Sequence, residues 1–242
     1  MPPALSPAQH LRRAAHLWKA VTQDHHRPLA PVLGARIPAD GVVFDVGAHA
    51  GQFAKLFARL APQGRVFAFE PAAYARSILG AVVQLRRLRQ VEILPLALGD
   101  QLQTLTLSTP LKRAGALGFG LAHLGAASGP ARQEPVRVTT LDAFVAERGL
   151  QRLDFLKADI EGHEGRLLAG ARASLARFRP ALLLELDAAR LARAGDAPGP
   201  ILANLVGLGY RAQRLFPDGA LEPVETIDAP GDFLFDPPGP AT

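Results

Sequence analysis

Hydrophobic residues along this chain follow two patterns that alternate from residue 42 onward. Short, nearly continuous apolar runs occupy residues 42–46, 65–69, 91–98, 155–158 and 181–186. Between them, apolar residues return every three or four positions, the spacing of an amphipathic helix. Continuous runs of this length are typical of strands that are buried on both faces. The alternation therefore predicts a doubly wound α/β fold with a mostly parallel sheet and right-handed crossovers.

The weaker patterns add helices and short strands to this framework. Helices are predicted at 51–60, 72–89, 165–176 and 201–208. Thr140 is a candidate N-cap for a further short helix. Alternating stretches predict an added strand at 104–108, extended chain at 136–138, and a terminal antiparallel pair at 210–215 and 232–235. These elements describe one domain over residues 41–236, which leaves too few residues for a second one.

The two ends of the chain and one internal segment lie outside this pattern. Residues 8–23 predict a helix with Leu11, Ala15, Trp18 and Thr22 on one face. Such a basic amphipathic helix can lie on a membrane, but more often it covers its own domain, so we expect residues 1–40 to form an N-terminal helical cap. Residues 109–134 hold five glycines and little periodicity, which predicts a mobile lid beside the acceptor. Residues 237–242 are expected to be a frayed tail.

Composition and charge narrow the class of protein. The 242 residues are 48% hydrophobic and 20% charged, and no run reaches the roughly 18–20 apolar residues of a membrane span. The absence of cysteine excludes disulfides and zinc–thiolate sites and suits a reducing cytoplasm, where we expect the protein. The net charge of +5 could attract an anionic partner. No dense basic tract with interleaved aromatic residues occurs, however, so we do not expect nucleic acid as a partner.

The first predicted strand ends in a glycine-containing turn, Asp45-Val46-Gly47-Ala48-His49-Ala50-Gly51. Glycines at such a turn allow close approach of the backbone to a ligand, and ligands of open α/β sheets bind beyond the carboxyl ends of the strands. A dinucleotide fingerprint would need glycine where this chain has His49. Asp45 repels a pyrophosphate but suits a cationic amino acid moiety, and Glu70 can accept hydrogen bonds from both ribose hydroxyls. These residues favour S-adenosylmethionine as the cofactor.

The chain resembles the FkbM family of methyltransferases from about residue 42 to 186, with a weaker continuation to 235. The resemblance is carried by Phe44-Asp45-Val46-Gly47-Ala48-His49-Ala50-Gly51, Phe69-Glu70-Pro71, Ala97-Leu98-Gly99-Asp100, Thr140-Leu141-Asp142, the run from Leu153 to Glu164 (LDFLKADIEGHE), Leu168, Gly170-Ala171 and Glu185. It implies a Rossmann-like class I methyltransferase fold whose seven strands run in the order 3-2-1-4-5-7-6, with the last strand antiparallel. Many members have Asn in place of His49, and a His is expected in place of Asp187, so the acceptor stays open.

The turn and the resemblance together assign a set of cofactor-binding residues. They are Asp45, Gly47, Ala48, His49, Gly51, Glu70, Pro71, Ala97, Leu98, Asp100 and Asp159. Family members of known role are similar to O-methyltransferases that act on natural products, sugars or glycolipids. The resemblance therefore implies O-methylation of a hydroxyl on a sugar, a glycolipid or polysaccharide, or a natural product. A small-molecule or glycan acceptor is the expected partner, and a homo-oligomer is compatible with the sequence.

Methylation of a neutral hydroxyl requires removal of its proton by a base or acidification by a metal. The catalytic candidates are Asp159, Glu161, His163 and Glu185, which follow the fourth and fifth core strands. We expect Asp159 to orient the methionine end of the cofactor and the acceptor. His163 is the candidate base because imidazole titrates near neutrality, although it could equally be an exposed histidine at a helix start. Glu161 can stabilise the same helix start or face the site.

A metal-dependent alternative uses Asp159, Glu185 and Asp187. This set resembles the carboxylates with which catechol O-methyltransferases hold magnesium, an ion that prefers oxygen ligands. His25 and His26 could suggest a second metal pair, but adjacent side chains on a helix point apart, so a surface or lid role is expected.

Two other enzyme classes compete with the methyltransferase interpretation. An NAD-dependent oxidoreductase is opposed by His49 in the fingerprint. A nucleic-acid base methyltransferase would normally carry an Asn/Asp-Pro-Pro-aromatic motif after the fourth strand, where this chain has Asp159-Ile160-Glu161-Gly162.

Overall fold

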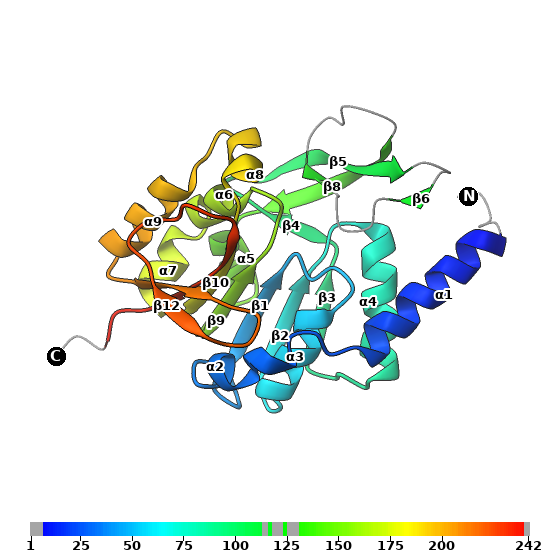
Figure 1. Cartoon of the computed structure of the whole chain (residues 1–242), viewed down its shortest axis with the longest axis horizontal. Helices are drawn as coiled ribbons and strands as arrows, with labels where there is room; N and C mark the ends of the chain where they lie inside the picture. The colour runs from blue at the N-terminus through cyan, green and yellow to red at the C-terminus, as the bar shows by residue number, and fades with distance from the viewer. Residues whose placement is uncertain (1–6, 113–115, 118–122, 125–130, 240–242) are drawn as a thin grey trace.

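The computed structural model describes residues 7–112, 116–117, 123–124 and 131–239, and its centre is an eight-stranded sheet (Figure 1). The strand order is β12-β11-β13-β10-β9-β1-β2-β3. The strands are β1 (Val42–Val46), β2 (Arg65–Phe69), β3 (Val91–Leu94), β9 (Phe155–Ala158), β10 (Ala181–Leu186), β11 (Arg211–Leu215), β12 (Leu221–Pro223) and β13 (Gly231–Asp236). The strands from β3 to β10 pair in parallel, whereas β13 runs antiparallel to both of its neighbours.

This sheet confirms the predicted order 3-2-1-4-5-7-6 with one addition. Strands β3, β2, β1, β9, β10, β13 and β11 occupy those seven places, and β13 is the antiparallel seventh strand. Strand β12 extends the edge next to β11 as an eighth strand. Its three residues, Leu221–Pro223, contain no apolar run from which a strand could be predicted. At the edge of a sheet, backbone hydrogen bonds to one neighbour are sufficient to form a strand.

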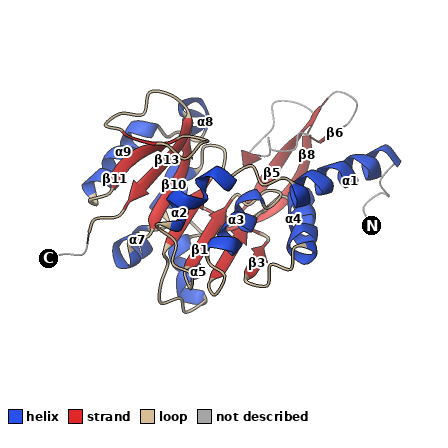
Figure 2. Ribbon diagram, turned by 60° about the horizontal axis from the view of Figure 1, so that its bottom comes forward, coloured by secondary structure: helices blue, strands red, loops and turns tan. Residues whose placement is uncertain are grey.

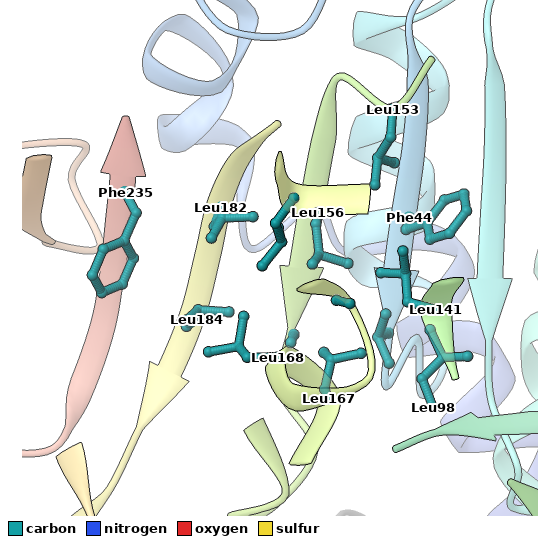
Figure 3. Close-up of a cluster of buried hydrophobic side chains, with 14 of the residues drawn as sticks. Phe44, Leu98, Leu141, Leu153, Leu156, Leu167, Leu168, Leu182, Leu184 and Phe235 are labelled. Carbon is teal, nitrogen blue, oxygen red and sulfur yellow. The ribbon is translucent and has the colours of Figure 1, made fainter. Parts of the chain in front are cut away.

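Helices cover both faces of the sheet, as a doubly wound fold requires (Figure 2). One face packs against η1 (Arg27–Leu29), α2 (Ala30–Gly34), α3 (Gln52–Leu60) and α4 (Ala73–Leu85). The other packs against α5 (Leu141–Glu147), α6 (Glu164–Ala169), α7 (Arg172–Phe178), α8 (Ala188–Arg193) and α9 (Pro198–Gly207). Figure 3 shows part of the hydrophobic cluster between the sheet and this second group of helices. Phe44 of β1, Leu156 of β9 and Leu182 of β10 belong to it. Thr140 is the N-cap of α5, as predicted.

Two predicted elements are wrong in extent because one residue interrupts each. The strand predicted at 91–98 divides at Pro95, which cannot donate to a sheet ladder, into β3 and β4 (Leu96–Leu98). The helix predicted at 165–176 divides into α6 and α7 at Gly170. A side chain at Gly170 would collide with the Gly99 carbonyl oxygen, so this close approach of two loops needs glycine.

A second, smaller sheet arises where the glycine-rich insertion was predicted. Strand β5 (Gln103–Lys112) and β8 (Ala131–Thr139) form a long antiparallel hairpin, and β8 also pairs in parallel with β4. Two short strands, β6 (Ala116–Leu117) and β7 (His123–Leu124), pair with β5. The predicted loop is therefore wrong at both of its ends, which continue the strands. The mobility of the lid stays a prediction, and residues 113–115, 118–122 and 125–130 lie outside the described residues.

The N-terminal helix α1 (Pro7–Thr22) lies beside α4, but its inward face is not the predicted one (Figure 1). Leu11 and Trp18 are 75% and 70% exposed, whereas Ala20 is buried. The buried Lys55 ammonium donates to the Ala20 and Gln23 carbonyl oxygens at the end of the helix, at 2.7 and 2.6 Å. The hydrogen bonds from Lys55 of α3 thus hold the face of α1 that carries Ala20 toward the domain. Within the described residues, no helix is both long and apolar enough for a membrane crossing.

Candidate active site

A cavity of about 420 Å³ opens at the carboxyl ends of β1, β2, β9 and β10 and brings most of the predicted site residues together. Those that line it are Gly47, Ala48, His49, Glu70, Pro71, Ala97, Leu98, Asp159, Glu161, His163 and Glu185. Asp45, Gly51, Asp100 and Asp187 are not part of its lining. The position is the one at which open α/β sheets bind ligands.

The turn after β1 forms one wall of the cavity and is held by β2 and β9. The backbone N–H groups of Gly47 and Ala48 donate to the Phe69 carbonyl oxygen at 3.0 and 3.1 Å. Gly47 has a φ of 76°, and a side chain there would collide with the Asp159 carbonyl oxygen. Gly51 has a φ of 86° at the start of α3, so its role is conformational and it makes no wall of the cavity.

Glu70 is the anchor of this wall. Its Oε2 accepts a hydrogen bond from the His49 backbone N–H at 2.7 Å, and its Oε1 accepts one from Ala72 at 2.8 Å. The residue is only 6% exposed, and burial raises its pKa to about 7 despite these donors. Two hydrogen bonds leave the carboxylate with further lone pairs, so it can still accept hydroxyl groups of a ligand. Burial also lowers the pKa of the His49 imidazole to about 4, which keeps it neutral.

Asp45 lies beneath the cavity instead of in it. Its carboxylate is fully buried, and Lys157 Nζ lies 3.4 Å from Asp45 Oδ1 and 3.7 Å from Asp159 Oδ2. The same ammonium donates to the Gly47 carbonyl oxygen at 2.9 Å. Burial would lower the pKa of Lys157, but Asp159 and Asp45 outweigh it and raise that pKa. The cationic partner of Asp45 is therefore Lys157, which sequence reasoning missed although it is the one charged residue of the buried strand β9.

The opposite end of the cavity gathers carboxyl groups from three strands. Asp159 follows β9, Glu185 lies in β10, and Asp232 of β13 pairs directly with Glu185 in the sheet register. Burial and then a hydrogen bond with Asp159 raise the pKa of Glu185 to about 8. Burial opposes ionisation of Asp159 too, but Lys157 and Glu185 outweigh it and lower its pKa. One ionised and one protonated carboxyl group therefore share a hydrogen bond at neutral pH.

Arg190 of α8 organises the outer edge of these carboxylates. Its Nη1 lies 2.6 Å from Glu185 Oε2 and 3.2 Å from Glu161 Oε2. Asp187 instead caps α8, because its Oδ1 accepts from the backbone N–H groups of Ala189 and Arg190.

This arrangement does not support the predicted magnesium site. The part of the chain that the structure describes contains no group of three His, Asp or Glu side chains placed to hold a metal ion. Asp187 is engaged by the helix start and Glu185 by Arg190 and Asp159, so the three expected ligands do not converge.

The buried Glu164 side chain fixes the loop that carries Glu161 and His163 through hydrogen bonds to the loop backbone. Glu161 and Gly162 both have positive φ, 58° and 99°, and His163 follows as the residue before α6. Glu164 is 1% exposed, and its Oε1 accepts from the backbone N–H groups of Ile160 at 2.9 Å and Gly162 at 3.4 Å. Burial raises its pKa to about 7. Glu164 thus determines the path of the loop that presents Glu161 and His163 to the cavity.

Residues before η1 and in the β5–β8 hairpin complete the walls of the cavity. His26, which precedes η1, stacks on Phe53 with ring centroids 3.9 Å apart and lines the cavity, and burial lowers its pKa to about 4. The hairpin β5–β8 contributes Arg132 and Glu134, and the Glu134 carboxylate accepts from the Ala73 N–H at 3.2 Å. Asp100, in contrast, is exposed and faces Arg166 on the outside.

Comparison with known proteins agrees with this architecture. Residues 45–212 match the methyltransferase FkbM domain. The chain is 32% identical over 199 residues to the AMB antimetabolite synthetase AmbE of Pseudomonas aeruginosa, a match that covers 68% of this chain and 9% of that protein. It is 28% identical over 154 residues to the 2-O-methyltransferase NoeI of Sinorhizobium fredii, covering 58% of this chain and 61% of that one. The chain thus spans less than two thirds of either relative.

Solved structures show the same fold at low sequence identity. Methyltransferase FkbM from Methylobacillus flagellatus superposes with a TM-score of 0.52 at 15% identity, over 94% of this chain and 60% of that one. An O-methyltransferase from Bacillus cereus in complex with SAH superposes with a TM-score of 0.50 at 12% identity, over 97% and 91%. The domain match covers more than half of the chain and includes the turn, Glu70 and the carboxyl group of Asp159. The chain therefore belongs to the FkbM methyltransferase family.

Proposed function

We propose that this protein transfers a methyl group from S-adenosylmethionine to a hydroxyl oxygen of a sugar, a glycolipid or polysaccharide, or a natural product. The observation that carries the proposal is the pairing, in one cavity, of Glu70 beside a glycine turn with Asp159 and His163 at the other end. The family match supports methyl transfer over the NAD-dependent alternative.

The residues at the Glu70 end fit the cofactor. A cavity of about 420 Å³ lies within the range of roughly 300–1,000 Å³ typical of small-molecule sites. Glu70 would accept the ribose hydroxyls, and Pro71, Ala97 and Leu98 provide an apolar surface for the adenine ring. Asp159 would face the cationic methionine end. When bound, the cofactor supplies an electrophilic methyl group on a sulfonium.

The residues at the other end fit the handling of a hydroxyl proton. The lowered pKa of Asp159 keeps its carboxylate available to accept a hydrogen bond from the acceptor. His163 lines the same end, on a loop held by Glu164, and we assign it the role of general base. Glu161 and Glu185, held by Arg190, would orient the acceptor.

Calorimetry tests the cofactor. We expect S-adenosylhomocysteine to bind in the micromolar range and NAD to bind far more weakly, because the turn after β1 has His49 where a dinucleotide fingerprint needs glycine. Tight binding of NAD without binding of S-adenosylhomocysteine would contradict the proposal.

Kinetics test the base. We expect His163→Ala to lower kcat about 10²–10⁴-fold with little change in cofactor affinity. The exposed His25, bonded to Gln23, supplies the matched control His25→Ala, which should keep full activity. The wild-type rate should fall as pH drops through the imidazole pKa. If His163→Ala were fully active while Asp159→Asn were inactive, the base would be Asp159 and the assignment to His163 would be wrong.

A further inference from the structure

The lining of the cavity comes partly from inside and partly from outside the segment that matches the family domain. The glycine turn, Glu70 and Asp159 lie within residues 45–212, the segment that matches the family domain. His26 and Asp232 also line the cavity, but they lie before and after that segment. Contacts with the acceptor at these two positions would therefore be made by residues outside the segment that matches the family domain.

Asp232 lies at the carboxylate end. It sits directly across the sheet from Glu185, and opposed residues of an antiparallel pair project on the same face with Cβ atoms roughly 4.5–5.5 Å apart. Leu183 of β10 continues the cavity wall beside this pair. Asp232 lines the cavity together with Asp159 and Glu185, and burial and the nearby Asp159 raise its pKa.

His26 closes the cavity from the N-terminal side and is firmly placed. Its ring stacks on Phe53 with an interplanar angle of 17°. The chain before it is held by Asp24, which lies 3.1 Å from Lys55 and 3.0 Å from Arg59, and by the hydrogen bond from Lys55 to the Gln23 carbonyl oxygen. Lys157 Nζ, which also contacts Asp159, lies 5.3 Å from the centroid of the Phe53 ring on which His26 stacks, so His26 lies near the Asp159 end of the cavity.

The charges around this end favour a neutral acceptor. A carboxylate or phosphate on the acceptor would meet the ionised Asp159 and the carboxyl group of Asp232, and like charges brought together in an enclosed site repel each other. A cationic acceptor gains little, because Lys157 already pairs with Asp159, and Arg190 with Glu161. Carboxyl groups and a neutral imidazole are suitable donors and acceptors for several hydroxyl groups at once.

We infer that His26 and Asp232 determine acceptor specificity and that the acceptor is a neutral, hydroxyl-rich compound of the carbohydrate type. This inference rests on the proposed O-methyl transfer and adds the class of acceptor and the residues that select it.

The experiment measures methyl transfer from labelled S-adenosylmethionine to three sets of methyl glycosides. The sets are neutral hexosides and deoxyhexosides, hexuronosides, and aminohexosides. The variants are His26→Ala and Asp232→Asn, with Asp228→Asn as a matched control, because Asp228 is an exposed carboxylate that bonds only Thr226 in the described residues. Binding of S-adenosylhomocysteine is measured for every variant.

We expect the wild type to prefer the neutral set, and Asp232→Asn to raise the relative rate of the hexuronosides about tenfold by removing one repelling carboxylate. His26→Ala should raise the KM for the acceptor and leave the affinity for S-adenosylhomocysteine within twofold. The control should match the wild type.

Distinct results would overturn the inference and the proposed function. Preference for a charged set, no transfer to any set by a protein that binds S-adenosylhomocysteine, or an unchanged preference in Asp232→Asn would overturn the acceptor class or the role of Asp232. A tenfold loss of S-adenosylhomocysteine affinity in His26→Ala would place His26 in the cofactor site instead. Failure of the wild type to bind S-adenosylhomocysteine would overturn the proposed function itself.

Discussion

The Glu70 end and the Asp159 end of the cavity are built on different principles. At the Glu70 end, a carboxylate is held by backbone N–H groups of residues close to it in sequence or in the adjoining turn, at 2.7 and 2.8 Å. At the Asp159 end, the carboxyl groups of Asp159 and Glu185 contact the side chains of Lys157 and Arg190, and Asp232 lies across the sheet from Glu185. The first end depends on backbone conformation, and the second on the balance of charges.

This difference determines how each end should tolerate change. Backbone donors cannot be removed by a single substitution, so the Glu70 end is altered only through the glycine conformation or through Glu70 itself. At the Asp159 end, a substitution of one charged residue removes a counter-charge from its partner, such as Lys157. A buried charge without a partner destabilises the folded protein. The Glu70 end is therefore suited to a constant cofactor, and the other end to an acceptor that differs between proteins.

The largest effect is expected at the glycine turn. Gly47→Ala places a side chain against the Asp159 carbonyl oxygen at a positive φ, where backbone strain alone costs about 1–3 kcal/mol. We expect a loss of about 3 kcal/mol or more in the free energy of unfolding, measured by urea denaturation, and loss of S-adenosylhomocysteine binding. Gly80→Ala is the control: it lies in α4 with open space around it and should stabilise by about 0.5–1 kcal/mol. Equal stability of Gly47→Ala and Gly80→Ala would mean that position 47 does not require glycine.

Glu70→Gln should weaken the Glu70 end without touching the other. Loss of hydrogen bonds to a charged group costs about 1.5–3 kcal/mol, which predicts a 10- to 100-fold higher Kd for S-adenosylhomocysteine by calorimetry. Glu92→Gln is a control from the neighbouring strand β3, where the carboxylate pairs with Arg148 on the surface. An unchanged Kd in Glu70→Gln would mean that this carboxylate does not contact the cofactor.

Because Glu164 is buried, we expect its protonation to change the stability of the folded protein between about pH 5 and pH 8, where solvent-exposed carboxylates stay ionised. Its pKa is raised from 4.5 to about 7 in the folded protein, so the folded state binds the proton more tightly than the unfolded state. The stabilisation is fully present below pH 4.5 and is lost as pH rises through about 7. Glu164→Gln keeps an acceptor oxygen without the charge. It should match the wild type near pH 5 and exceed its stability by about 2 kcal/mol at pH 8. Parallel pH profiles of the two proteins would contradict this account.

The smallest effect is expected at Asp100. The sequence predicts a cofactor contact, whereas the structure places this carboxylate on the outside, near Arg166. Asp100→Asn should therefore leave the Kd for S-adenosylhomocysteine within twofold. A tenfold loss would mean that the loop reaches the cofactor and that the sequence-based assignment is right.

Much of the framework could be predicted because its signals are local. Four of the core strands have the predicted bounds, since a buried parallel strand must be a short continuous apolar run. The glycine turn can be predicted because a strand-to-helix turn that approaches another chain segment needs positive φ at fixed positions. Glu70 can be predicted because it directly follows a buried strand. Where prediction failed locally, as at Pro95 and Gly170, one residue ended an element that the hydrophobic pattern alone would have continued.

The sequence by itself determined the fold class, the turn, Glu70 and the candidates Asp159, Glu161, His163 and Glu185. Only the tertiary structure placed Asp45 against Lys157, Asp187 at the start of α8, and His26 and Asp232 in the cavity. The physical reason is the range of the interactions. Conformational requirements act between neighbours in the chain and leave a pattern there. Charge pairing and cavity walls depend on the register and packing of strands that are distant in sequence, and no local pattern records them.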